Sequence, residues 1–185
     1  SLNNNFTSPV IVNYDYTNTE LYTLMSFAQD DFNRFDACER VYFSLISKLI
    51  KDVKEQKELV LDQEFLSAFR ELLKDNSLDP LFKAYALDFI SLGEYNNSLK
   101  SFDLENSDKV IRFILNTIGI EFQNELLDLL NTLHTKDEYK LDHISMGKRA
   151  LKSVCMKYLM ASRTSTAIDA ICNVYLNATN MTDEF

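Results

Sequence analysis

The residues that could do metal or acid–base chemistry are few in this sequence. Only two His residues occur, His134 and His143, and they flank a polar stretch that also holds Asp137 and Glu138. A zinc site needs several His, Cys or carboxylate ligands held close together, commonly one helical turn apart, and no H-E-x-x-H motif is present. Because two lysines interrupt the cluster, a solvated helix end explains it better than a metal site.

Three carboxylates, Glu121, Glu125 and Asp128, follow one another at helical spacing. Paired carboxylates can act as general acid and base, so this row is a second candidate for chemistry. The row lies opposite an apolar stripe of the same predicted helix, which is the position of a solvated face. We therefore expect these three side chains to be solvated rather than catalytic.

The three cysteines, Cys38, Cys155 and Cys172, are widely spaced, and each is predicted on the apolar side of a helix. A cysteine nucleophile needs a neighbouring base, and neither His adjoins a Cys in the sequence. Free buried thiols are typical of a reducing compartment, so the sequence predicts a cytoplasmic protein. A regulatory domain with redox-sensing thiols is the alternative.

A small basic patch occurs in an otherwise acidic chain, formed by Lys148, Arg149, Lys152 and Lys157. It could contact an acidic neighbouring domain or a substrate carboxylate, but a solvated basic face with partners four residues away is favoured. The chain has no Gly-rich loop that could cradle a phosphate. The sequence thus predicts no catalytic, cofactor-binding or metal-binding residue of its own.

Composition indicates an all-α fold. The chain has 185 residues, 46% of them hydrophobic and 25% charged, and contains only three Gly and two Pro. Sheet-rich folds need many turns, which draw on both residues, so their scarcity favours long helices joined by polar corners. The net charge of −9 opposes binding to nucleic acid, and no apolar run reaches the roughly 18 residues of a membrane span.

Helix starts are marked clearly along the chain. Thr17 with Glu20 forms a capping box, Asp62 and Asp142 are N-cap residues, and Asp79 precedes a Pro at a first helical position. A single long helix is predicted from about Ser107 through residue 133, with Gly119 inside it where another backbone packs closely. The predicted buried positions near helix ends include Leu24, Tyr85, Phe89, Ile90, Ile168, Ile171, Val174, Tyr175 and Ala178.

Two domains are predicted. Residues 1–16 are β-branched and aromatic, which indicates an extended segment at the end of a preceding β-domain, and residues 17–185 form stacked antiparallel helix pairs. Residues 91–102 should be a corner with one helical turn. Because residues 180–185 read as the opening turn of another helix and no initiator Met is present, we expect a fragment of a longer protein.

Six segments match the motifs of one family in collinear order: Phe6–Val10 (F-S-A-P-V in the family), Asp31–Ala37 (D-x-F-x-R-W-[DE]-A, with Phe35 in place of Trp), Leu78–Pro80, Glu125–Leu127, Lys148–Lys152 (K-R-x-L-[KR]) and Asn180–Asp183 (N-M-T-D). In these segments the chain resembles bacterial-type aminopeptidase N, a zinc-dependent alanyl aminopeptidase. The resemblance implies that this chain is the first half of the helical C-terminal domain, an armadillo- or HEAT-like curved array.

The resemblance also implies a function for the longer protein. The whole enzyme would remove N-terminal residues from peptides with a zinc-bound water and a glutamate base, both held by a preceding domain. This chain would cap the active site, exclude folded proteins and pack against the catalytic and β-domains of the same polypeptide. Alone it would be inactive. The alternative is a stand-alone helical-repeat adaptor that binds a partner peptide in a groove.

Overall fold

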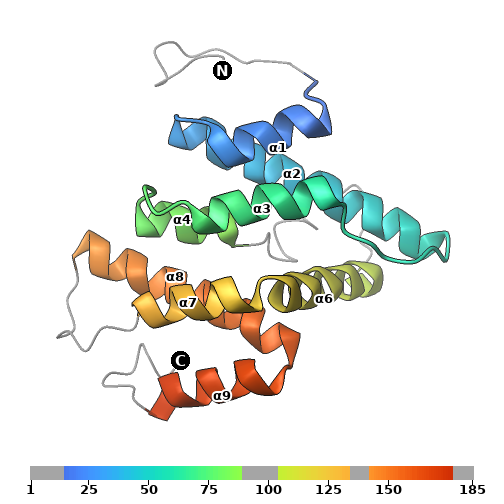
Figure 1. Ribbon diagram of the computed structural model, residues 1–185. Coiled ribbons are helices and arrows are strands. Elements are labelled where there is room, and N and C mark those ends of the chain that lie inside the picture. The colour runs from blue at the N-terminus through green and yellow to red at the C-terminus, as the bar shows by residue number, and fades with distance from the viewer. Residues whose placement is uncertain (1–14, 89–103, 134–141, 177–185) are drawn as a thin grey trace.

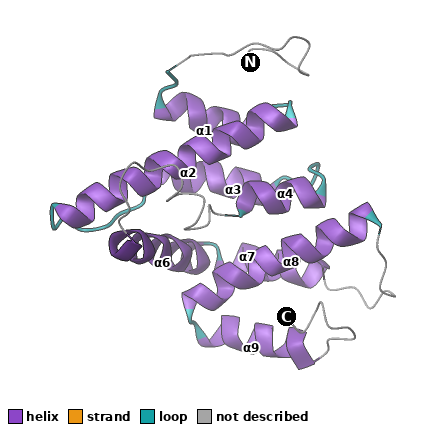
Figure 2. Ribbon diagram, turned by 180° about the vertical axis from the view of Figure 1, so that it is seen from behind, coloured by secondary structure: helices purple, strands orange, loops and turns teal. Residues whose placement is uncertain are grey.

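The structure is a computed structural model that describes residues 15–88, 104–133 and 142–176 (Figure 1). These residues form helices and loops and contain no strand, as Figure 2 shows, so the predicted all-α class is confirmed. The helices are α1 (Asn18–Phe27), α2 (Asp31–Lys54), α3 (Gln63–Lys74), α4 (Pro80–Leu87), α6 (Leu104–Glu121), α7 (Gln123–Leu133), α8 (His143–Ser162) and α9 (Ser165–Leu176).

Four helices, α1, α3, α4 and α8, begin at the caps that the sequence predicts. Thr17 and Glu20 form the capping box of α1, and the Asp62 and Asp142 side chains each accept the backbone N–H three residues later. Asp79 accepts the N–H groups of Leu81 and Phe82, with Pro80 at the start of α4. Each cap satisfies orphan donors of a first helical turn, which fixes the boundary locally.

The helices stack in layers down the molecule (Figure 1). α1 packs against α2 and α3 at one end, and α2 also contacts α4 and α6. α8 lies in the centre of the other half, against α4, α6 and α7, and α9 packs on α8 and α7 at the far end. Apart from α6 and α7, which continue from one into the other, successive helices reverse direction along the stack (Figure 1), so the predicted array of antiparallel helices is confirmed.

An aromatic cluster joins the layers. Phe69 stacks on Phe122 with ring centroids 5.4 Å apart and meets the Tyr158 ring edge-on at 5.7 Å. Phe65 continues the cluster to Phe69 and to Tyr42. These rings come from α2, α3, α8 and the α6–α7 junction, and all are buried, so one core runs through the described helices.

The single long helix predicted from Ser107 is wrong, because the chain bends at Phe122 into α6 and α7. Helical hydrogen bonds continue through the bend, from Phe122 N to Ile118 O (3.0 Å) and from Leu126 N to Phe122 O (2.9 Å). No Pro or Gly lies at the bend. The change of direction keeps both α6 and α7 against α8, so tertiary packing decides it.

Three predicted core residues are exposed instead. Tyr85 is 59% exposed because α4 is short and buries Ala84, Ala86 and Leu87 on the sides it presents to its neighbours. Ile168 and Tyr175 are exposed because α9, the last described helix, is covered on one side only, where Ala167 and Val174 are buried. Leu24 and Ile171 are partly buried against the core.

Some predictions fall on residues that the structure does not describe. They concern the extended segment up to residue 14, the buried positions Phe89 and Ile90, the corner at 91–102, Ala178, and the helix start at 180–185. These stay predictions, as does the domain boundary at residue 17. Among the described residues, none of the helices has the length and apolar character needed to cross a membrane.

Candidate functional site

The predicted carboxylate row is an ion-pair site between layers. Arg70 of α3 reaches Glu121 of α6 at 3.2 Å and Glu125 of α7 at 3.4 Å, with its guanidinium 5.0 Å from the centre of the Phe122 ring. Asp128 is exposed. The row is therefore neither a paired-carboxylate site nor a merely solvated face, because Arg70 uses two of its members to join α3 to the α6–α7 bend.

Replacing Arg70 with Ala should lower the free energy of unfolding by on the order of 1 kcal/mol, because the ion pairs are half-exposed and the ring contact is modest. Urea unfolding at low and high salt measures the loss, which should shrink as salt screens the two carboxylates. Arg112→Ala is the matched control, since Arg112 forms one exposed pair with Asp108 four residues away. An equal effect of both substitutions would contradict the interlayer role of Arg70.

The cysteines differ from the prediction in one case. Cys38 and Cys155 are buried and free, and burial raises the pKa of each thiol to about 12. Such thiols are protonated at neutral pH and poor nucleophiles, which weakens the redox-sensor alternative. Cys172 is free but exposed, so its predicted burial is wrong, for the same reason that Ile168 and Tyr175 are exposed on α9.

The predicted basic patch does not form a single solvated face. Lys152 is buried, while Lys148 and Arg149 are half-exposed. Lys157 donates to Asp88 at 2.6 Å, a partner 69 residues away at the end of α4 rather than four residues away on its own helix. The patch is thus partly a contact between α8 and α4, and the expectation of partners four residues away is wrong for Lys157.

The histidine cluster is only partly described. His134, Asp137 and Glu138 lie outside the described residues. The Nε2 atom of exposed His143 lies 2.9 Å from Asp79 Oδ2, so this ring joins the N-terminal ends of α8 and α4. Within the ranges that the structure describes, no three His, Cys, Asp or Glu side chains lie close enough together to hold a metal ion.

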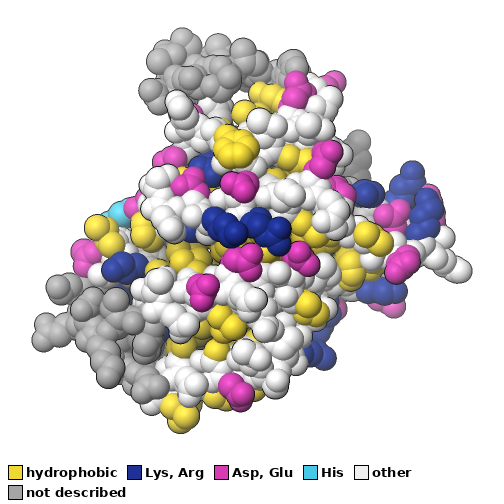
Figure 3. Space-filling view, viewed as in Figure 1, with side chains coloured by type: hydrophobic (Ala, Val, Ile, Leu, Met, Phe, Trp, Pro, Cys, Tyr) yellow, Lys and Arg dark blue, Asp and Glu magenta, His cyan; other side chains and the backbone are white. Residues whose placement is uncertain are grey.

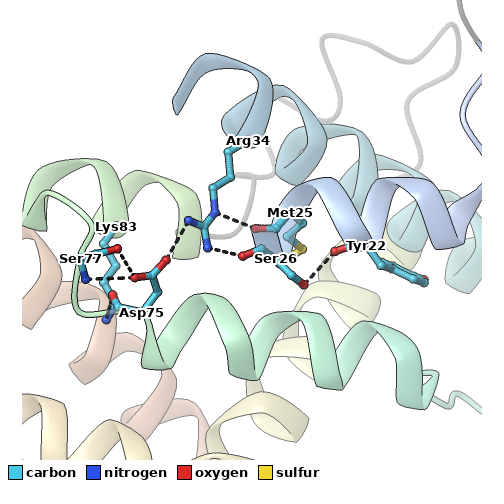
Figure 4. A network of polar contacts seen from close by, with 7 residues as sticks. All are labelled: Tyr22, Met25, Ser26, Arg34, Asp75, Ser77 and Lys83. Carbon is cyan, nitrogen blue, oxygen red and sulfur yellow. Dashed lines mark hydrogen bonds and ion pairs between the residues drawn. The ribbon is translucent and has the colours of Figure 1, made fainter. Parts of the chain in front are cut away.

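Arg34 is the centre of a polar network that the sequence does not reveal (Figure 4). Its side chain is only 5% exposed and donates to Met25 O at 2.9 Å, Ser26 O at 2.6 Å and Asp75 Oδ2 at 2.9 Å. The two carbonyls belong to the last turn of α1, which has no intrahelical donors for them. One side chain of α2 therefore closes the end of α1 and ties it to the residue that follows α3.

Asp75 is held ionised within this network. Hydrogen bonds from Ser77 and Arg34 hold its pKa below the usual range, against the opposing effect of desolvation. Lys83 of α4 is buried beside it and donates to the Asp75 backbone carbonyl at 3.0 Å (Figure 4). Burial lowers the pKa of Lys83. The network thus links four helices, α1 to α4, through two buried cations.

The same device recurs at other helix ends. Tyr42 and Tyr158 each donate a hydroxyl hydrogen bond of 2.6 Å to the end of α4, at Ala86 O and Leu87 O, and Asn116 donates to Ala161 O near the end of α8. Helices commonly end with a Gly in the left-handed conformation, and this chain has three Gly in all. Side chains from neighbouring helices satisfy these three carbonyls, so the ends of α4 and α8 depend on tertiary packing, although α8 also ends with a left-handed residue, Arg163.

A surface groove lies between α1 and α3. It has a volume of about 450 Å³ and is lined by Thr19, Tyr22, Thr23, Ser26, Phe27, Gln63, Glu64, Ser67, Ala68 and Glu71. The lining combines two aromatic rings with two carboxylates and contains no Lys, Arg or His. Of the features described, this groove has the shape and chemistry to receive another molecule.

Antiparallel helices stacked around one continuous core define a helical-repeat domain. The comparisons agree with this class. Residues 18–185 match the family described as "Domain of unknown function (DUF3458_C) ARM repeats", and the chain belongs to that family, the C-terminal helical domain of aminopeptidase N.

Relatives with established names are aminopeptidases. The chain is 28% identical over 181 residues to aminopeptidase N of Escherichia coli and 24% identical over 178 residues to that of Haemophilus influenzae, matches that cover 96% of this chain and 20% of each relative. It is similar, with a TM-score of 0.78 and 26% identity, to aminopeptidase A of Legionella pneumophila, solved in complex with aspartic acid. That match covers 98% of this chain and 22% of the other. The predicted resemblance is confirmed, and the chain spans about a fifth of these relatives.

Proposed function

We propose that this chain is the architectural part of a longer zinc-dependent aminopeptidase, in which it covers the catalytic chamber and limits entry to peptides. The observation that carries the proposal is the match of nearly the whole chain to aminopeptidase N together with its all-helical fold. An enclosed chamber excludes water and folded proteins, and a stack of helices is suited to form its wall.

Zinc in the longer protein would be held outside this chain. The described residues do not fit a zinc site, since no cluster of three ligand-type side chains exists among them. What these residues supply is rigidity: the buried cations Arg34 and Lys83 and the Arg70 ion pairs fix neighbouring layers. In this proposal the protein works in the cytoplasm, which suits the free buried thiols of Cys38 and Cys155.

The purified chain should show no turnover of Ala- or Leu-aminoacyl chromogenic substrates with added zinc, while Escherichia coli aminopeptidase N is active in the same assay. Activity that survives removal of contaminating peptidases would contradict the proposal. The gene provides an independent test: upstream codons for H-E-x-x-H followed by a distant Glu support it. Upstream coding sequence without that motif would favour the adaptor alternative.

A further inference from the structure

The groove between α1 and α3 presents an uncovered aromatic side chain. Phe27, the last residue of α1, lines the groove and is 66% exposed, whereas Leu21 and Met25 of the same helix are buried. Tyr22 and Ala68 add apolar surface beside it. Phe27 therefore does not stand alone but extends an apolar patch at the edge of a concave surface, and such patches mark binding sites more often than single exposed rings do.

Two carboxylates on α3 line the same groove without a cation. Glu64 and Glu71 form no ion pair with another described residue, although Glu64 accepts a hydrogen bond of 3.3 Å from Thr19. Figure 3 shows this face, on which acidic side chains flank hydrophobic ones between α1 and α3, with one basic side chain at the margin of the same region. The two residues are seven apart, which places them about 10 Å apart along one face of the helix at 1.5 Å per residue.

The walls of the groove are fixed in place. Tyr22 of α1 donates to Asp62 at 2.8 Å, and the Thr19–Glu64 hydrogen bond also crosses from α1 to α3. Arg34 holds the last carbonyls of α1 beside Phe27. A site that is already formed loses little conformational entropy when a partner binds.

We propose that this groove receives a cationic amphipathic helix that lies outside this chain. A helix parallel or antiparallel to α3 has the same rise per residue, so Lys or Arg at positions i and i+7 would face Glu64 and Glu71. Apolar side chains at i+3 and i+4 would then cover Tyr22 and Phe27 on the same face. The inference rests on the groove alone and does not depend on the proposed function.

A second copy of this chain does not fit the same description. No two of its 19 Lys and Arg residues are seven positions apart, and its net charge of −9 opposes self-association through an acidic groove. The complementary helix therefore has to be a segment whose sequence is not contained in these 185 residues.

The test is a fluorescence anisotropy titration of the chain with a synthetic helical peptide that carries Lys at i and i+7 and Leu at i+3 and i+4. We expect saturable binding that weakens as salt is added. Glu71→Lys and Phe27→Ser should each weaken binding roughly tenfold. The first reverses a charge that faces the peptide, and the second removes the aromatic ring that the Leu side chains of the peptide would cover. Asp128→Lys makes the same charge change on exposed α7 and should leave the affinity unchanged.

Four results would overturn the proposal. A peptide with Glu in place of both Lys residues could bind equally well, which would exclude charge complementarity. A peptide of the same composition with a central Pro could bind equally well, which would indicate an extended occupant. The third result is the absence of saturable binding. The fourth is a loss of affinity with Asp128→Lys that equals the loss with Glu71→Lys. Circular dichroism of each variant confirms that the fold is retained.

Discussion

Replacing Arg34 with Met should lower the free energy of unfolding by roughly 3 to 5 kcal/mol, as found when one partner of a buried ion pair is removed. The substitution roughly keeps the volume of the side chain and deletes the three hydrogen bonds that Arg34 donates. It leaves the Met25 and Ser26 carbonyls buried without a partner and removes the cation beside Asp75. Urea denaturation followed by circular dichroism measures the loss, and the thermal midpoint should fall by about 10 °C.

Two further variants separate the causes. Arg34→Lys retains the charge but cannot reproduce the fork that reaches two carbonyls and a carboxylate, so it should be intermediate. Arg40→Met removes an exposed pair with Asp36 on the same helix and should change stability by less than about 1 kcal/mol. If Arg34→Met were as mild as Arg40→Met, the capping of α1 by Arg34 would not contribute to stability.

The local signals in the sequence predict most of the fold. Thr17, Asp62, Asp79 and Asp142 begin helices because each satisfies donors within its own first turn, a requirement that no distant residue alters. On α2 the buried residues Cys38, Tyr42, Leu45, Ile46 and Leu49 follow helical spacing, so the period of the sequence marks the side that faces the core. The spacing of hydrophobic residues and the N-cap residues therefore suffice to predict features that depend on only one or two helical turns.

The end of α4 and the bend between α6 and α7 depend on residues far away in the chain, so local sequence patterns do not predict them. The carbonyls at the end of α4 are satisfied by Tyr42 and Tyr158, which lie 44 and 71 residues from their acceptors. No Gly or Pro lies at the Phe122 bend itself, so the bend has no local sequence signal there and follows from packing on α8. A sequence pattern contains no signal for such distant pairs.

The polar network and the groove were missed for different reasons. Arg34 lies four residues before Cys38, on the apolar side of α2. A charged residue at such a position indicates a buried side chain with polar partners. Lys83 and Lys152, both buried, are similar cases. The groove has no comparable signal, because Phe27 and Glu71 are ordinary members of separate helices until α1 and α3 pack side by side.

The sequence correctly predicts that another backbone packs closely against Gly119. A Cβ atom placed there would overlap the Tyr158 carbonyl oxygen and lie 3.1 Å from the Ser162 Cβ, so the backbones of α6 and α8 are in contact. In an isolated helix Gly→Ala would stabilise by about 1 kcal/mol. In this protein the gain in helix propensity is opposed by the cost of moving α6 and α8 apart. The nearest group that a methyl would meet is a backbone carbonyl, which cannot rotate away as a side chain can.

We therefore expect Gly119→Ala to destabilise the protein by roughly 2 to 3 kcal/mol, because overpacking at a rigid contact exceeds the propensity gain. Gly119→Val should be worse, since the added methyl groups meet the same carbonyl. Ser153→Ala, on the exposed side of α8, should be neutral or slightly stabilising. Chemical denaturation of the three variants provides the comparison, and stabilisation by Gly119→Ala would mean that α6 and α8 lie farther apart than described.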